Sequence, residues 1–396
     1  MAGTQAPLLT LRETDGVAAR TTARIASIDA LRGLVMLLML VDHVRDFFYV
    51  HAQVADPMNL ATTDPRLFWT RTAAHLCAPV FVLLTGLSAS LYADRHGDHA
   101  QASLFLLRRG LILVLLELTL VNIAWTGSPV PPILYLQVIW AIGLGMIALA
   151  GLLWLPRPAL IGVALAIMLG HNLLTPVVLA PGEGGYTLWA ILHQRGLIDL
   201  PWGVARTSYP VLPWIGVMAA GYALGPWFTS EMPARTRRYR LLGLGAATLA
   251  GFLILRGLNG YGEPVPWQAG TSWDATLRAF LNLTKYPPSA AFLLATLGLG
   301  LVLLAALEAV PPRSLGWLCT YGGVPLFFYV AHLYALRLLD DGLKAAGFAA
   351  SSGRIEAPGP VHLWLIAAAL GLALYPVCRW AVRFKRRSPA RWVSYF

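Results

Sequence analysis

The sequence predicts an all-α polytopic membrane protein, a bundle of about ten transmembrane helices, and three observations support this fold class. Of the 396 residues, 57% are hydrophobic and only 12% are charged, whereas soluble proteins carry roughly 25% charged residues. The mean hydropathy is +0.62. Apolar runs of about 20 residues, long enough to cross a hydrocarbon core of ~30 Å, recur from one end of the chain to the other.

The apolar runs predict ten helices in a single transmembrane domain over residues 24–384. A polar segment, 1–23, precedes this domain, and a basic tail, 385–396, follows it. The polar segment has no short apolar core of the kind that marks a signal peptide. All three cysteines lie in apolar runs, so no disulfide framework is expected. The expected helices are 30–50, 67–92, 104–125, 133–154, 158–180, 209–228, 239–256, 285–308, 315–339 and 361–384.

Lysine and arginine in the loops predict the orientation, because they concentrate on the cytoplasmic side of membrane proteins. With the N-terminus inside, the inner segments hold seventeen such residues and the longer outer segments hold nine. An even number of helices then places both termini in the cytoplasm. The net charge of +11 is therefore explained by topology, and nucleic acid is not an expected partner.

Two long outer loops, residues 181–208 and 257–284, are rich in Gly, Trp and Pro. Each contains a short apolar segment, Leu188–Leu192 in the first and Ala275–Leu283 in the second. Loops of this length are often functional lids. Anchoring of Trp and Tyr at the membrane interface explains them equally well, and both interpretations stay open. No internal repeat of the kind seen in many transporters is visible.

The first expected helix carries four ionisable residues near its outer end: Asp42, His43, Arg45 and Asp46. Such groups are costly in hydrocarbon and usually face a partner or a water-filled cavity. Asp42 and Arg45 are spaced i,i+3, as are His43 and Asp46, so each pair shares a helix face. Asp46 can therefore support His43 as a base, or the pairs can simply neutralise one another.

Depth along the helices predicts a polar chamber that opens outward. His43 lies roughly 10 Å below the outer surface on the first helix, and His75 roughly 12 Å below it on the second. Two antiparallel neighbours should bring these imidazoles together. His332 can belong to the chamber or be a structural histidine, and His51 is expected at the membrane surface. Further polar residues at this level are Arg71, Glu117, Asn122, Gln137, His171 and Asn172.

Several kinds of site are not supported by the sequence. It contains neither the G-x-x-x-x-G-K-[ST] phosphate loop nor the H-E-x-x-H metalloprotease pattern. A metal held by His43, His75, His332 and Asp46 would need four separate residues to converge, and no spacing requires it. No metal is therefore expected.

The opening RIASIDALRGLVMLLMLVDHVRDFF resembles the first catalytic-domain helix of the heparan-α-glucosaminide N-acetyltransferase family and its bacterial relatives. HLCAPVFVLLTGLSASLY, at 75–92, resembles the motif of their second helix. Segments 209–225, 285–300 and 322–339 resemble later parts of the bacterial members. The resemblance implies transfer of an acetyl group from cytosolic acetyl-CoA to an acceptor across the membrane, in a bacterial inner membrane, with a sugar or glycan acceptor.

The resemblance also implies site residues, with one departure. The family's catalytic histidine follows this helix, near the place of His51, and an asparagine stands roughly where His43 does. His43, His75 and His51 are therefore all candidates, as base or nucleophile. Arg45 or Gln137 can stabilise the oxyanion. Expected substrate-binding residues are Asp42, Arg45, His51, Arg71, Glu117, Gln137 and His332.

The charged donor should meet basic residues on the inner side, namely Arg108, Arg109 and Arg238, which serve equally well as topology signals. Membrane lipid is an expected partner, and the sequence leaves a homodimer open. A proton-coupled transporter or flippase of a polar or lipid-linked solute is the alternative function, because a polar chamber suits a proton relay too. A ligand-sensing receptor has no attached signalling domain to support it. Binding or hydrolysis of acetyl-CoA would separate the acyltransferase from the transporter.

Overall fold

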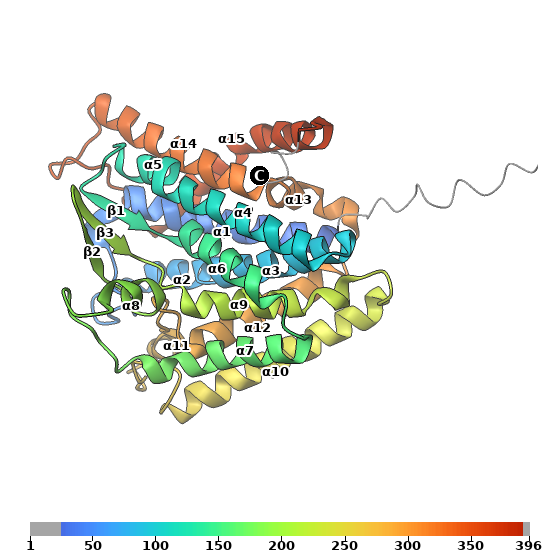
Figure 1. Ribbon diagram of the computed structural model, residues 1–396. Coiled ribbons are helices and arrows are strands. Elements are labelled where there is room, and N and C mark those ends of the chain that lie inside the picture. The colour runs from blue at the N-terminus through green and yellow to red at the C-terminus, as the bar shows by residue number, and fades with distance from the viewer. Residues whose placement is uncertain (1–24, 391–396) are drawn as a thin grey trace, which may run out of the picture.

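A computed structural model describes residues 25–390 and shows a bundle of helices with a small sheet at one end (Figure 1). Segment 1–23, with Arg12 and Arg20, lies outside the described residues, as do Arg24 and the last six residues of the tail. The helices are α1 Ala26–Phe48, α2 Pro65–Ala74, α3 Cys77–His96, α4 His99–Leu116, α5 Asn122–Thr126, α6 Val138–Leu152, α7 Arg157–Gly170, α8 Tyr186–Leu192, α9 Leu212–Ala223, α10 Ala234–Leu258, α11 Trp273–Leu281, α12 Ala290–Leu307, α13 Gly316–Gly322, α14 Pro325–Ala345 and α15 Pro360–Arg387.

The helical membrane fold is confirmed, and each of the ten expected runs contains a helix. Among the described residues, five helices are long and apolar enough to cross a membrane, or six if the bent pair α13–α14 counts as one span. The helix α1 is absent from that group because charged side chains interrupt its apolar run. The number of crossings therefore stays a prediction, as does the orientation.

Several expected boundaries were wrong. The second run divides into α2 and α3, with His75 at the end of α2. The third run contains a π-helical turn, η2, from Glu117 to Val121. The fourth begins with a strand, the fifth ends at Leu174 instead of residue 180, and the eighth begins at Ala290. The ninth bends by 60° between α13 and α14. Breaks of this kind place polar residues inside the bundle.

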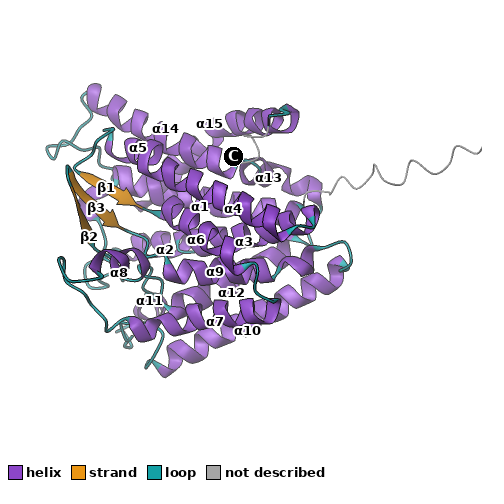
Figure 2. Ribbon diagram, viewed as in Figure 1, coloured by secondary structure: helices purple, strands orange, loops and turns teal. Residues whose placement is uncertain are grey.

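A three-stranded sheet lies at the loop-rich end of the molecule, beside α8 (Figure 2). Its strands are β1 Ile133–Leu136, β2 Leu197–Leu200 and β3 Gly203–Thr207, in the order β1-β3-β2. The β1–β3 pair is parallel and the β2–β3 pair antiparallel. The sheet was not predicted, because its short strands lie at the edge of an apolar run and within an expected loop. It holds the segment before α9 against the segment before α6.

The helix α1 is the centre of the bundle, and α13, α14, α15, α3, α2 and α12 pack around it. Glycines allow its closest approach to α13. A Cβ atom on Gly33 would collide with the carbonyl oxygen of Leu318, and one on Gly322 would collide with that of Asp29. The backbones of α1 and α13 therefore touch near the end of the bundle at which α1 begins.

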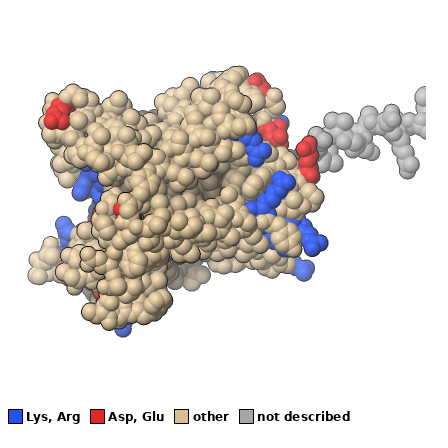
Figure 3. All heavy atoms as spheres, turned by 90° about the horizontal axis from the view of Figure 1, so that it is seen from below, with Lys and Arg blue, Asp and Glu red and all other residues tan. Residues whose placement is uncertain are grey.

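The surface agrees with a protein that lies in lipid. Large apolar side chains are exposed on the outer helices, for example Leu372 of α15, which is 74% exposed, and Ile254 of α10, which is 64% exposed. Figure 3 shows lysine and arginine gathered at the two ends, while the surface between them is almost free of charge. Such a broad apolar surface is typical of contact with a membrane.

The contact between α1 and α13 predicts a difference between two glycine substitutions. Gly33→Ala should lower stability by about 1–3 kcal/mol, because an inserted methyl group in a closely packed site forces the backbones apart. Gly162→Ala is the matched control, since Gly162 lies inside α7 with open space around it. Alanine there should leave stability unchanged or raise it by about 0.5–1 kcal/mol. Thermal unfolding in detergent measures both, and equal melting temperatures would contradict the close approach.

Candidate active site

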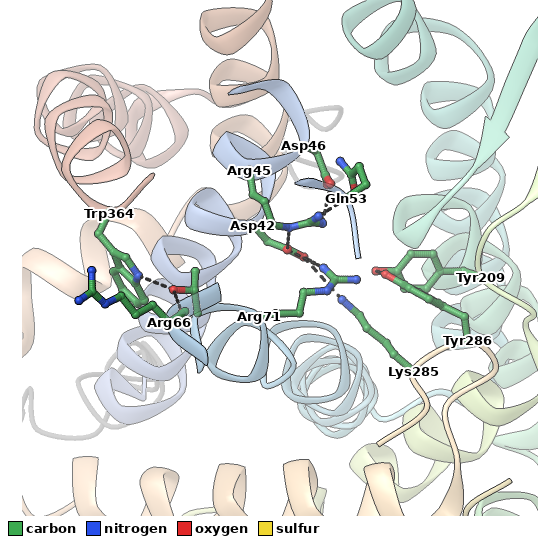
Figure 4. A network of polar contacts seen from close by, with 11 residues as sticks. Asp42, Arg45, Asp46, Gln53, Arg66, Arg71, Tyr209, Lys285, Tyr286 and Trp364 are labelled. Atoms are coloured by element: carbon green, nitrogen blue, oxygen red, sulfur yellow. Dashed lines mark hydrogen bonds and ion pairs between the residues drawn. The ribbon is translucent and has the colours of Figure 1, made fainter. Parts of the chain in front are cut away.

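Three cationic side chains converge on the buried carboxylate of Asp42 near the C-terminal end of α1 (Figure 4). Arg45 Nε lies 3.0 Å from Asp42 Oδ1, one turn further along the same helix. Arg71 Nη1, from α2, lies 2.5 Å from Oδ1 and 2.6 Å from Oδ2. Lys285 Nζ, from the segment before α12, lies 3.7 Å from Oδ2. The expected Asp42–Arg45 pair is therefore part of a larger network.

The network extends from Arg45 into the loop after α1 and the segment before α12. Its Nη2 lies 2.6 Å from Asp46 Oδ1, and its Nη1 donates to Gln53 Oε1 at 2.9 Å. Asp56, in the same loop, accepts the Lys285 backbone N–H at 3.0 Å. Burial raises the pKa of the Asp56 carboxyl, and the nearby positive charges of Arg71 and Lys285 only partly offset this. These bonds connect α1, the loop after it and the segment before α12.

His43 is paired with a histidine, although not the one expected. Its Nδ1 lies 2.7 Å from Nε2 of His332 on α14. His332 Nδ1 lies 2.8 Å from the Phe328 carbonyl oxygen. A carbonyl oxygen only accepts, so the neutral His332 carries its proton on Nδ1 and accepts at Nε2. His43 must then donate from Nδ1, which leaves its Nε2 as an unprotonated, basic nitrogen.

A cavity of about 340 Å³ runs beside α1, from Ile25 at one end to His43 and Lys285 at the other. The His43 end is also lined by Tyr209 and Tyr329, and the Tyr209 hydroxyl lies 3.1 Å from that of Tyr286. The middle is apolar. This arrangement places the His43 imidazole at one end of the cavity and separates it from the opposite end by an apolar wall.

The opposite end of the cavity is basic. Arg32, Arg95, Arg109 and Lys385 line it. The Nε atom of Arg109 is buried and has no hydrogen-bond partner among the described residues. Donors of this kind suit an anionic group such as a phosphate. Arg109 was predicted for this role from the sequence, and Arg32, Arg95 and Lys385 were not.

Several of the expected contacts are absent or are replaced by others. Within residues 25–390, no hydrogen bond or ring contact joins His43 to His75, whose imidazole packs edge-on against Phe292. The expected support of His43 by Asp46 is also replaced, because the Asp46 carboxylate binds Arg45. Arg71 points to Asp42 rather than to His75. His51 is exposed in a short 3-10 turn after α1.

Glu117 and Gln137 meet each other, but the contact is structural. The fully buried Glu117 carboxylate accepts the backbone N–H groups of Gln137 and Trp140, both at 3.3 Å. The N–H groups at the start of a helix have no partner within the helix, and the Glu117 side chain supplies the missing acceptors for α6. Arg108 is exposed and Arg238 is half-buried, and neither lines the cavity. No three potential metal ligands come together in the described chain.

Comparison with known families matches residues 24–257 to the catalytic domain of heparan-alpha-glucosaminide N-acetyltransferase. The match covers more than half of the chain. The chain belongs to this family. It is therefore an acyltransferase of the membrane, as the resemblance predicted. Among curated proteins, none matches the chain significantly. The family match ends within α10, so His332, Lys285 and Tyr329 lie beyond it.

The sequence analysis did not single out three residues that line this end of the cavity, Tyr209, Lys285 and Tyr329. It also did not single out Trp125, whose ring packs against His43. The signal available for Lys285 was a lysine one residue before two prolines, which are followed by an apolar helix. Tyr329 is one turn before His332 and shares its helix face. Tyr209 opens the segment 209–225, which resembles the bacterial members, whereas Trp125 belongs to no recognised motif. Only the fold brings these two residues close to His43.

The convergence of three cations on Asp42 predicts that this carboxylate is required for stability. Asp42→Asn should lower the free energy of unfolding by about 3–5 kcal/mol, because it leaves buried charges without their partner. Asp274→Asn is the matched control: it breaks a 2.7 Å ion pair with Arg278 in which the Asp274 side chain is 51% exposed. That change should cost about 1 kcal/mol or less. Thermal unfolding in detergent tests the pair, and similar losses would contradict the buried network.

Proposed function

We propose that this protein transfers an acetyl group from acetyl-CoA, taken up from the cytoplasm, to a hydroxyl or amine of a sugar or glycan on the outer side. The observation that carries the proposal is the cavity along α1, which has a basic group of arginines at one end and the basic nitrogen of His43 at the other. A single narrow path of this kind suits a long donor with a charged head and a reactive thioester at its tip.

The length of the cavity supports a long donor of this kind. From Ile25 to His43 the cavity follows α1 over eighteen residues, roughly 27 Å at 1.5 Å per residue. The phosphates would lie against Arg109 and its basic neighbours, and the apolar middle would hold the pantetheine arm. The thioester would then lie beside His43. The unpartnered Arg109 Nε supports this placement, because a buried donor is costly unless something accepts from it.

His43 supplies the base in this proposal. Its Nε2 takes the proton of the acceptor hydroxyl or amine while the acceptor attacks the thioester carbonyl carbon. The carbon–sulfur bond then breaks, and the leaving CoA thiolate recovers the proton from His43. The pair with His332 holds the imidazole in the tautomer that this step requires. Lys285 and Arg71 place positive charge nearby, which disfavours a protonated amine and so favours the nucleophilic form.

The proposed orientation follows the charge distribution: the basic end of the cavity faces the cytoplasm and the sheet faces outward. Both termini lie inside, and the host membrane is a bacterial inner membrane. The positively charged inner loops support this. It also gives the donor and the acceptor separate entrances, so the acetyl group crosses the membrane while CoA stays on the inner side.

The first test of this function compares CoA binding with turnover. His43→Ala should lower the release of CoA from acetyl-CoA, measured with glucosamine as acceptor, by about 10²–10⁴-fold, as for loss of a general base. Its affinity for CoA should be unchanged. Arg109→Gln should have the opposite signature, weaker CoA binding with the chemical step retained. Calorimetry and a thiol-release assay in detergent measure the two quantities.

The exposed His51 provides the control for the His43 variant, since His51→Ala should keep full turnover. If His51→Ala abolishes turnover while His43→Ala retains it, the catalytic base belongs to the loop after α1. If the wild-type chain neither binds CoA nor releases it from acetyl-CoA, the acyltransferase proposal fails, and the transporter alternative should replace it.

The orientation has its own test. Thr271→Cys, in the exposed segment before α11, should react with a membrane-impermeant maleimide applied to intact cells. Thr236→Cys, exposed at the start of α10, should react only after the cells are opened. The wild-type protein gives the background labelling from its own three cysteines, two of which are buried. The reverse labelling pattern would overturn the proposed orientation.

A further inference from the structure

Tyr329, on α14, presents a hydroxyl at the cavity wall that has no hydrogen-bond partner among the described residues. The residue is only 3% exposed. A buried polar group that is left unpaired costs about 1–3 kcal/mol, and such groups are rare enough in native proteins to need an explanation, a catalytic role among them. The hydroxyl is therefore a candidate ligand-binding group.

The surroundings of Tyr329 determine where its proton can point. The indole of Trp125 lies beside the hydroxyl, but an indole N–H only donates and cannot accept that proton. Among the described residues, no hydrogen bond joins the Tyr329 hydroxyl to the nearby Glu117 carboxyl group, whose oxygens accept two backbone N–H groups of α6. Neither neighbour therefore takes the hydroxyl proton, which leaves the cavity as its direction.

The hydroxyl also lies close to the proposed base. The rings of Tyr329 and His43 are 5.8 Å apart between centroids, at an interplanar angle of 77°. The Trp125 ring meets His43 from another side, at 5.1 Å. Tyr329 and His43 thus share one end of the cavity, where the thioester of the donor would lie. A hydrogen-bond donor at this position can reach the oxygen of the thioester carbonyl group.

We propose that the Tyr329 hydroxyl is the oxyanion donor of the acetyl transfer, an inference that rests on the proposed function. As the acceptor's lone pair forms a bond to the thioester carbonyl carbon, the carbonyl π electrons move onto the oxygen, and the acceptor's proton passes to His43 Nε2. Tyr329 donates a hydrogen bond to this oxyanion. When the carbonyl re-forms, the carbon–sulfur bond breaks and the thiolate takes the proton from His43.

This assignment replaces the two oxyanion donors expected from the sequence. The Arg45 guanidinium is occupied by Asp42, Asp46 and Gln53. The Gln137 backbone donates to Glu117 at the start of α6, and its side chain does not line the cavity. Tyr329, by contrast, has a free donor at the cavity wall and shares a helix with His332.

Tyr329→Phe tests the inference, because it removes one oxygen atom and keeps the ring. The turnover of acetyl-CoA should fall about 10²–10³-fold, the loss expected for one oxyanion donor. The KM for acetyl-CoA and the affinity for CoA, which lacks the acyl oxygen, should be unchanged. The melting temperature should stay the same or rise, since a buried unpaired hydroxyl is removed.

Tyr334→Phe is the matched control on the same helix. Its hydroxyl donates to the Leu120 carbonyl oxygen at 3.0 Å, so its loss should leave turnover unchanged. Full turnover by Tyr329→Phe would overturn the inference. A loss of CoA affinity as large as the loss of turnover, or a lower melting temperature, would also overturn it, because either result indicates a structural role. A wild-type chain that neither binds CoA nor turns over acetyl-CoA would overturn the proposed function, and this inference with it.

Discussion

The structure depends on the burial of one carboxylate, Asp42, among three cations inside an apolar bundle. Charges of this kind are stable in a low-dielectric interior only when they are paired at close range. The pairing joins α1 to α2 through Arg71 and to the segment before α12 through Lys285. Elements that are far apart in the sequence are thereby brought to the same end of the cavity. The ion network thus positions the site, while its own charges are occupied with one another.

The groups left for chemistry are neutral. His43 and His332 form a short chain that ends on the Phe328 carbonyl oxygen, and this chain decides which nitrogen of His43 is basic. Tyr329 adds a hydroxyl whose proton faces the same space. Structural and chemical roles thus fall to different residues. A neutral imidazole or hydroxyl can exchange protons with a substrate, whereas an arginine that neutralises a buried carboxylate must stay paired with it. The family match covers α1 but not α14. The hydrogen bond between His43 and His332 therefore joins a helix inside the matched region to a helix outside it.

Irregular helices make this arrangement possible. The π-helical turn at Glu117 turns a carboxylate towards the start of α6, and the bend between α13 and α14 directs His332 towards α1. Glycines at the contact of α1 with α13 allow the two backbones to touch. Regular helices of the expected lengths would have presented these side chains elsewhere. Local departures from helical geometry are common at functional sites for this reason.

The sequence by itself determined the membrane-bundle class, the family and the importance of the C-terminal end of α1, because apolar run length and the density of ionisable residues are local properties. It also placed Asp42, His43 and Arg109 among the functional candidates. Only the tertiary structure decided that His43 meets His332 instead of His75, that Asp46 serves Arg45, and that Tyr329 faces the cavity. The His43–His332 contact joins residues 289 positions apart, and all three outcomes depend on helix rotation and helix breaks. Depth along a helix can be counted from a sequence, but the direction in which a side chain points around the helix is set by what packs against it.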